Sequence, residues 1–168
     1  MQRKANQMGT TSRVGFGYDV HRLEENETLY LGGIKIEHYK GTVAHSDGDV
    51  LIHAICDAML GAAGLRDIVY HFPDTDKEFK NISSLILLKK IVKLLLENNY
   101  RIINIDSTIC LQKPKIQDYI PDMKIALSKV IKTDTSNISI KATTTERLGF
   151  VGSEEGITSY AVVLIEKV

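Results

Sequence analysis

The chain has 168 residues, of which 43% are hydrophobic and 25% are charged, and its 21 basic residues balance its 21 acidic ones. This length and composition are typical of one globular domain that can bury a substantial core. Because nucleic acids and anionic membranes attract proteins with an excess of cationic residues, the neutral balance argues against both as main partners.

The cysteine content and the start of the chain bear on its location. Two cysteines are too few for a disulfide framework, and no apolar run approaches the roughly 18 residues of a membrane helix. The first residues are polar and lack the apolar core of a signal peptide, so we expect a disordered or added lead over 1–12 and a single domain over 13–168. The cytoplasm is the expected location, and the stroma of an organelle is the alternative.

The first predicted elements are a strand and a hairpin. Residues 13–21 alternate in character, so they predict a strand with one apolar face, and Asp19 and His21 share its other face. Residues 28–31 and 34–36 flank a Gly-Gly pair, which indicates a hairpin.

A helix is predicted next, over residues 46–63. Ser46 is the expected N-cap, Asp49 falls at the third helical position, and Gly64 follows as a stop signal. The later elements are a helix over 82–97, a strand over 101–111, a mostly helical segment over 114–131 that Pro121 interrupts, and strands over 137–145 and 158–167.

These elements predict an α+β fold. We expect a mixed four-stranded sheet, or one slightly larger, with helices on one face. A sheet covered on one face must expose its other face to solvent or bury it against another subunit, and the lack of a second helical layer favours an oligomer.

Asp19, His21 and His53 form the first candidate site. Residues two positions apart at a strand end point the same way, and His53 has carboxylates four residues away on either side, at Asp49 and Asp57. Two histidines and one carboxylate are a common zinc ligand set that leaves a fourth position for substrate. The structural alternative is a strand-end aspartate, a surface histidine and a satisfied core histidine.

Two further segments contain groups that can bind phosphate. Residues 44–49 (AHSDGD) put a histidine and a serine at a predicted helix N-terminus, which suits an anion. Residues 141–146 (KATTTE) would put Thr144 and Glu146 on one face if the strand stays extended, and a carboxylate there can hold a magnesium-type cation between phosphates. Helix capping and the strand propensity of threonine are the respective alternatives.

An acidic turn is the last candidate. Residues 72–76 read FPDTD, a turn sequence with two carboxylates. These carboxylates could accept hydrogen bonds from the hydroxyl groups of a polyol. An exposed acidic turn without a ligand is the alternative.

Together, these segments resemble the 2-C-methyl-D-erythritol 2,4-cyclodiphosphate synthase family of the non-mevalonate isoprenoid pathway. The resemblance runs from residue 13 to the C-terminus, in the family's order and spacing. The matching stretches are VGFGYDVHRL, LGGIKI, AHSDGDVLIHAICDAMLGAAGLRDI, FPDTD, QKPKI and IKATTTERLGF.

The resemblance implies a reaction and an assembly. Family members cyclise 4-diphosphocytidyl-2-C-methyl-D-erythritol 2-phosphate: the 2-phosphate attacks the β-phosphorus, and CMP leaves. They are homotrimers with active sites between subunits. By this resemblance the domain is expected to be a phosphorus–oxygen lyase that uses Zn²⁺ together with Mg²⁺ or Mn²⁺.

The resemblance also implies roles by position. Asp19, His21 and His53 would bind zinc, and Glu146 the second cation. His45 and Thr144 match transition-state stabilisers, and Ser46, Asp67 and Asp74 match contacts to the erythritol part. The cytidine pocket matches Leu111, Gln112, Lys113, Pro114, Lys115, Ile116, Gln117, Ala142, Thr143 and Thr144. Further substrate contacts are expected from Ile68, Val69, Phe72, Pro73, Thr75, Asp76, Thr145, Phe150 and Ser153.

Three positions depart from the family pattern. Val69 replaces a glycine beside the polyol, which puts the local backbone placement in doubt, and Ser153 replaces an arginine near the diphosphate, which removes a cationic contact. Tyr160 replaces a glutamate that in some members faces the trimer axis, where an Arg/Glu pair lines a cavity for isoprenoid diphosphates. We therefore expect such ligands not to bind there in the same way.

Two other functions stay open. The missing arginine is compatible with a metal-dependent nucleotide- or isoprenoid-binding module, which would bind CMP or CDP without turnover. A zinc phosphohydrolase would release a linear rather than a cyclic product.

Overall fold

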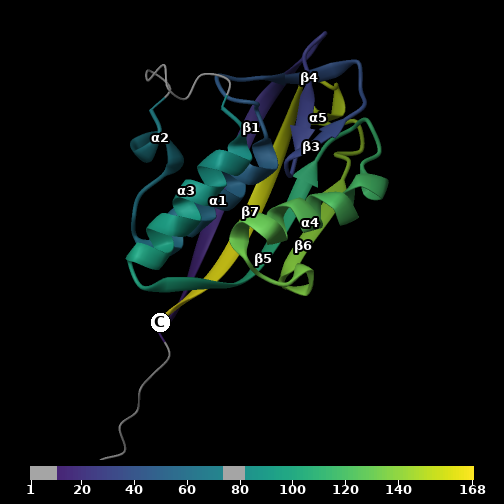
Figure 1. The fold of residues 1–168 in the computed structure, drawn as a ribbon. Helices are drawn as coiled ribbons and strands as arrows, with labels where there is room; N and C mark the ends of the chain where they lie inside the picture. Colours follow the sequence, from purple (N-terminus) through teal and green to yellow (C-terminus); the bar gives the residue numbers. More distant parts are fainter. Residues whose placement is uncertain (1–10, 74–81) are drawn as a thin grey trace, which may run out of the picture.

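The structure, a computed structural model, describes residues 11–73 and 82–168. Its strands form a five-stranded mixed sheet in the order β4-β1-β7-β5-β6 and a separate hairpin of β2 and β3 (Figure 1). Within the described residues, β5 and β6 are parallel and the other pairs are antiparallel. The strands are β1 (Ser12–Glu25), β2 (Leu29–Leu31), β3 (Ile34–Ile36), β4 (Lys40–Val43), β5 (Tyr100–Cys110), β6 (Ile138–Thr143) and β7 (Gly156–Lys167).

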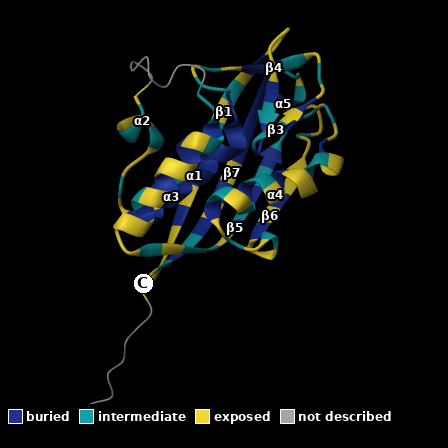
Figure 2. Ribbon diagram, viewed as in Figure 1, coloured by how far each residue is buried: buried dark blue, intermediate teal, exposed yellow. Residues whose placement is uncertain are grey.

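The three long helices cover one face of the sheet (Figure 1). α1, which is buried along most of its length (Figure 2), packs against β1 and β7. The helices are α1 (Val50–Ala63), α2 (Ile68–His71), α3 (Ser84–Glu97), α4 (Ile120–Ile131) and α5 (Gly149–Gly152), with 3₁₀ turns at Gln117–Tyr119 and Thr135–Asn137. No helix in the described part of the chain combines the length and the apolar character needed to cross a bilayer.

The helices on one face and the mixed sheet agree with the prediction, and the sheet has five strands, one more than the four that the sequence indicated. The fifth strand is β4, which pairs with the end of β1 because β1 continues past His21 to Glu25. The sequence of β4, KGTV, has no apolar alternation that would signal a strand. The short helices α2 and α5 were also not predicted.

Helix α1 lies directly on the glycines of β1. A Cβ atom built on Gly17 would lie 1.9 Å from the carbonyl oxygen of Ala54, and one built on Gly15 would lie 1.9 Å from that of Ala58. Glycine is therefore needed at both positions for this close helix–strand contact. The contact also fixes how α1 is placed along β1.

The apolar face of β1 lies on the opposite, uncovered side of the sheet. Phe16 is 64% exposed and Val14 is 68% exposed. Across the ladder to β7, Phe16 faces Val162 and Tyr18 faces Tyr160, so the apolar area continues onto that strand. This face is not part of the core of one chain.

Two predicted element boundaries are wrong for local reasons. α1 begins at Val50, and its N-cap is Asp49 rather than Ser46, because Gly48 adopts a left-handed conformation with φ 68° that a helix cannot contain. β6 ends at Thr143, before the predicted Thr145. The predicted stop at Gly64 is confirmed, with φ 74° in the left-handed region.

Candidate active site

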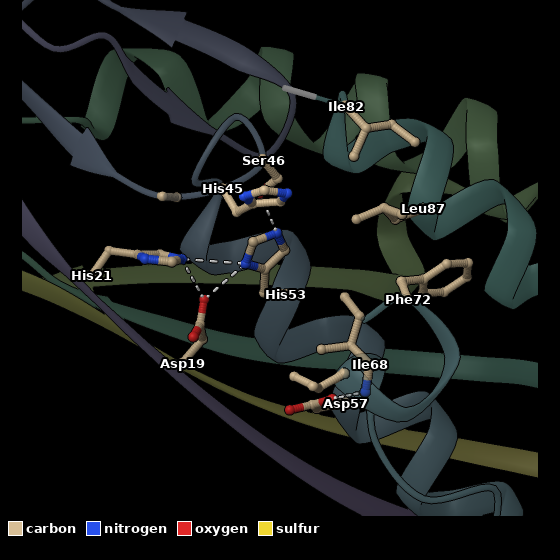
Figure 3. Close-up of a pocket in the computed structure, with 12 residues that line it drawn as sticks. Asp19, His21, His45, Ser46, His53, Asp57, Ile68, Phe72, Ile82 and Leu87 are labelled. Carbon is tan, nitrogen blue, oxygen red and sulfur yellow. Dashed lines mark hydrogen bonds and ion pairs between the residues drawn. The ribbon is translucent and has the colours of Figure 1, made fainter. Parts of the chain in front are cut away.

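The packing of α1 on β1 brings the predicted metal ligands together. Gly17, Asp19 and His21 share the helix-facing side of β1, because side chains along a strand alternate. Gly17 contacts Ala54, whose neighbour along α1 is His53. His53 Nδ1 consequently lies 3.0 Å from Asp19 Oδ2 and 3.3 Å from His21 Nε2 (Figure 3).

These three side chains have the geometry of a cation site. His21 Nε2 lies 3.1 Å from Asp19 Oδ2, so the three atoms form a nearly equilateral triangle. Ligands bound tetrahedrally at 2.0–2.1 Å from zinc would be about 3.3 Å apart. The triangle therefore matches one face of such a tetrahedron and leaves its fourth corner open. Among the described residues, this group is one that could hold a divalent cation.

The electrostatics of the triad fit the same purpose. Burial acts to raise the pKa of Asp19, but hydrogen bonds from His21 and His53 outweigh it and lower this pKa to about 2. Burial acts to lower the pKa of His53, but the Asp19 carboxylate outweighs it and raises this pKa. An ionised carboxylate beside two imidazole rings is a donor set that suits a divalent cation.

The triad opens into a cavity of about 160 Å³. His45 and Ser46, both predicted site residues, lie at its rim near His53 (Figure 3). The lining contains predicted site residues together with residues that were not predicted. It comprises Asp19, His21, Ala44, His45, Ser46, His53, Asp57, Ile68, Val69, Phe72, Ile82 and Leu87. Val69, the first departure from the family pattern, is thus part of the cavity wall, with 55% of its surface exposed.

The Asp49 side chain occupies part of the helix N-terminus that the sequence suggested for an anion. Asp49 Oδ1 accepts hydrogen bonds from Ile52 N and Gly32 N, both at 3.0 Å, and Oδ2 accepts one from Gly33 N at 2.7 Å. The buried Asp49 carboxylate therefore caps α1 and ties it to the β2–β3 turn. It occupies part of the position that an anion would take.

A second cavity, of about 260 Å³, collects most of the predicted cytidine-pocket residues. It lies where β5 and β6 end at the far edge of the sheet. The lining comprises Leu111, Gln112, Pro114, Lys115, Ile116, Gln117, Ala142, Thr143 and Thr144. Lys113 lies outside this lining and forms an ion pair with Glu154 at 3.0 Å.

Thr144 and Glu146 meet by a different route from the predicted extended strand. Glu146 sits in a turn with φ 54°, and Thr144 Oγ1 donates to Glu146 Oε1 at 3.2 Å. Both residues are exposed. The turn presents a hydroxyl and a carboxylate side by side beside the second cavity, because Thr144 belongs to its lining.

Several predicted contacts lie outside both cavities. Asp67 caps α2 by accepting from Tyr70 N at 2.8 Å, and Pro73 is exposed. Thr145 and Phe150 line a small cavity with Tyr18 and Tyr160. Ser153 Oγ donates within its own turn, to Gly149 O and Phe150 O. Asp74, Thr75 and Asp76 fall outside the described residues.

The structure also adds residues that the sequence-based prediction did not include. Asp57 lines the first cavity, and its position four residues after His53 was a usable signal. Ser84 Oγ lies 2.9 Å from His53 Nε2, and Ser84 also contacts the Asp47 carboxylate. No sequence pattern links Ser84 to His53, because 31 positions separate them.

Comparisons with known proteins identify the family. A sequence model of the YgbB family matches residues 12–166. The 2-C-methyl-D-erythritol 2,4-cyclodiphosphate synthase of Bacteroides thetaiotaomicron is 60% identical over 155 residues, which cover 92% of this chain and 98% of that protein. IspF from Plasmodium falciparum, solved as a CDP complex, has a TM-score of 0.82 at 36% identity, with 94% of this chain and 97% of that chain covered.

A larger protein shares the fold as one of its parts. Bifunctional IspDF from Campylobacter jejuni has a TM-score of 0.92 at 42% identity. The match covers 95% of this chain but 43% of that longer one. With a family match over nearly its whole length, this chain belongs to the YgbB family, alongside the 2-C-methyl-D-erythritol 2,4-cyclodiphosphate synthases.

Proposed function

We propose that this protein converts 4-diphosphocytidyl-2-C-methyl-D-erythritol 2-phosphate into 2-C-methyl-D-erythritol 2,4-cyclodiphosphate and CMP, as a step of the non-mevalonate isoprenoid pathway. The observation that carries the proposal is the convergence of Asp19, His21 and His53 at a cavity, in a chain 60% identical to a synthase of this name. The single domain over 13–168 would be catalytic, and the cytoplasm is the proposed location.

Two cation sites would serve the reaction. Asp19, His21 and His53 would hold Zn²⁺, for which the tetrahedral spacing of their donor atoms is the support. Glu146 would hold Mg²⁺ or Mn²⁺, which prefer carboxylate oxygens. When bound, the cations would supply positive charge against the repulsion between two phosphates and against charge that builds up in the transition state.

The protein side chains would mainly bind and orient the substrate. The attacking 2-phosphate is already ionised, so no strong general base is needed. Holding both ends of one molecule makes the attack intramolecular, which is a large gain in rate. His45 and Thr144 would stabilise the transition state, and Ser46 and Asp67 would contact the erythritol part.

The second cavity would bind the cytidine end. Its lining includes most of the stretch from Leu111 to Gln117, without Lys113, and the end of β6. A relative that shares the fold was solved as a CDP complex, which supports a cytidine diphosphate ligand here. Phe150 and Ser153 would lie at the edge of the bound diphosphate.

In a homotrimer with active sites between subunits, the first cavity of one subunit would lie next to the second cavity of a neighbouring subunit. Within one chain, three strand positions separate β1 from β6, which is roughly 14 Å. The uncovered sheet face combines an apolar half on β1 and β7 with a polar half on β5 and β6 that carries the Asp106–Lys141 ion pair. Such a face suits burial against a second copy of the chain.

Phosphorus NMR of a reaction mixture tests the proposal. Purified protein with Zn²⁺ and Mg²⁺ should convert the cytidyl diphosphate substrate to the cyclic diphosphate and release CMP. A linear product would indicate a phosphohydrolase instead. CDP binding by calorimetry without turnover would indicate a binding module. A native mass of three chains is expected from the same preparation.

A further inference from the structure

A partly buried hydrogen-bond relay runs from Asp47 through Ser84 to His53. Ser84 is the first residue of α3 and is fully buried. Its Oγ lies 2.9 Å from His53 Nε2, and its hydroxyl contacts Asp47 Oδ1 at close range. His53 thus has one ring nitrogen on the relay and the other, Nδ1, on the proposed cation site.

The direction of the hydrogen bonds follows from the chemistry of Asp47. Its carboxylate also accepts from Ser84 N at 2.8 Å and from Asp49 N at 3.2 Å, so all its partners are donors. An ionised carboxylate can only accept, so the single hydroxyl proton of Ser84 goes to Asp47. Ser84 Oγ then meets His53 Nε2 as an acceptor, and the proton between them belongs to His53.

This direction sets the tautomer of His53. With the proton held on Nε2, the lone pair of the neutral ring lies on Nδ1, which points at Asp19 Oδ2 and His21 Nε2. A histidine that ligates a metal through one nitrogen commonly donates from the other, and that bond fixes the ring and its tautomer. Ser46 Oγ is a second acceptor for the same Nε2, but at 3.3 Å it is more distant.

The relay also explains how α3 begins. Ser83 is the N-cap residue of α3, but its side chain makes no capping hydrogen bond. The Asp47 carboxylate takes this role from another part of the chain by accepting from Ser84 N. The start of α3 is therefore tied to the loop that precedes α1, which keeps Ser84 Oγ within hydrogen-bond distance of His53 Nε2.

We propose that Ser84 and Asp47 are positioning residues that hold His53 in its Nε2–H tautomer and aim Nδ1 at the zinc site. This inference rests on the proposed function, because it requires that Asp19, His21 and His53 bind Zn²⁺. Neither residue is part of the lining of the first cavity. Their effect is on metal affinity and on the state of the His53 ring.

The test measures the affinity for zinc alone, by competition with a chromophoric chelator. Ser84→Ala removes the nearer of the two acceptors and should raise the dissociation constant for zinc roughly ten- to a hundredfold, the usual effect of losing such a partner. Asp47→Asn should weaken zinc binding in the same direction. Ser83→Ala is the matched control, since it makes the same change one residue away without touching the relay, and it should bind zinc like the wild type.

A second measurement does not depend on how the variants fold. In the zinc-loaded wild type, ¹⁵N-labelled histidine should show a slowly exchanging Nε2–H proton on His53, and Ser83→Ala should keep it. Rapid exchange of this proton in the wild type would overturn the relay even if Ser84→Ala fails to fold. A folded Ser84→Ala with unchanged zinc affinity would do the same.

The outcomes distinguish a failure of the relay from a failure of the proposed function on which it rests. If the wild type binds zinc and folded Ser84→Ala binds it with the same affinity, the relay is overturned but the proposed function is not. A wild type that binds no zinc overturns the metal site of the proposed function, and the relay with it. A purely structural role for Ser84 would lower the unfolding temperature of the metal-free variant while leaving the zinc affinity of the folded protein unchanged.

Discussion

His53 Nδ1 and Asp19 Oδ2 lie 3.0 Å apart, although 34 positions separate the two residues in the chain. The distance is short because Gly17 has no side chain and lets α1 rest on β1. An imidazole and a carboxylate held this way, with His21 beside them, form a group that could hold a divalent cation.

Removing one ligand should abolish metal binding. His53→Ala leaves two protein ligands, and we expect loss of both bound zinc and turnover, because two ligands seldom hold the metal. Zinc content by elemental analysis and CMP release measure the two effects. His38→Ala is the control, since His38 makes an edge-to-face contact with the Tyr39 ring and belongs to neither cavity. Retention of full zinc content by His53→Ala would contradict the triad.

The second cation site should be separable from the first. Glu146→Ala is expected to keep one zinc per chain but to slow turnover, because the exposed Glu146 turn shares no residue with the triad. Titration of the rate with Mg²⁺ or Mn²⁺ should show a weakened response in the variant. An unchanged rate and an unchanged metal response would argue against a two-cation reaction.

Asp57 should make stability depend on pH. Burial raises the pKa of Asp57, which the hydrogen bond from Ile68 N offsets in part. A carboxyl whose folded pKa is raised contributes stability below its unfolded pKa and loses that contribution as pH rises through the folded value. Metal-free Asp57→Asn keeps an acceptor for Ile68 N without the charge.

Its unfolding temperature should therefore exceed that of the wild type at pH 7, with the gap closing near pH 4. The control is Asp134→Asn, at an exposed aspartate whose pKa the hydrogen bonds from Ser136 lower, and this change should bring no gain at pH 7. Equal unfolding temperatures of Asp57→Asn and wild type across this range would refute the burial argument.

The glycine contact between β1 and α1 should be essential for stability. Gly17→Ala places a Cβ 1.9 Å from the Ala54 carbonyl oxygen, so α1 must move away. We expect a loss of about 3 kcal/mol, the upper part of the overpacking range, together with weaker zinc binding.

Gly61→Ala makes the same substitution on the exposed side of α1, where the nearest atom is 4.0 Å away. It should gain about 0.5–1 kcal/mol from helix propensity. Denaturant unfolding of the two variants measures both values. A Gly17→Ala protein as stable as the wild type would mean that α1 does not rest on β1 as described.

Local sequence patterns predicted which segments form helices and strands better than they predicted which segments lie side by side in space. The alternation in β1 and the apolar face of α3 predict these elements because each period follows from backbone geometry. The strand β4 could not be predicted, because KGTV becomes a strand through the length of its partner β1. The start of α1 was misplaced because a serine cap looked plausible without knowing the conformation of Gly48.

The candidate site likewise contains some residues that local sequence patterns predict and others that only the fold brings together. Asp19 and His21 share a strand face, which the sequence alone predicts, and His53 joined them because two histidines and one carboxylate are a common zinc ligand set. The contact of Ser84 with His53 could not be predicted from the sequence, because it depends on α3 beginning beside His53 rather than on any sequence spacing. The separation of the two cavities in one chain was likewise not readable from the order of the residues.

The most direct test of the account is a crystal structure of the zinc-loaded protein, with anomalous data collected on both sides of the zinc absorption edge. We predict one zinc peak per chain within bonding distance of Asp19 Oδ2, His21 Nε2 and His53 Nδ1, with its fourth position facing the first cavity. A peak at other residues, or none in a zinc-soaked crystal, would contradict the account.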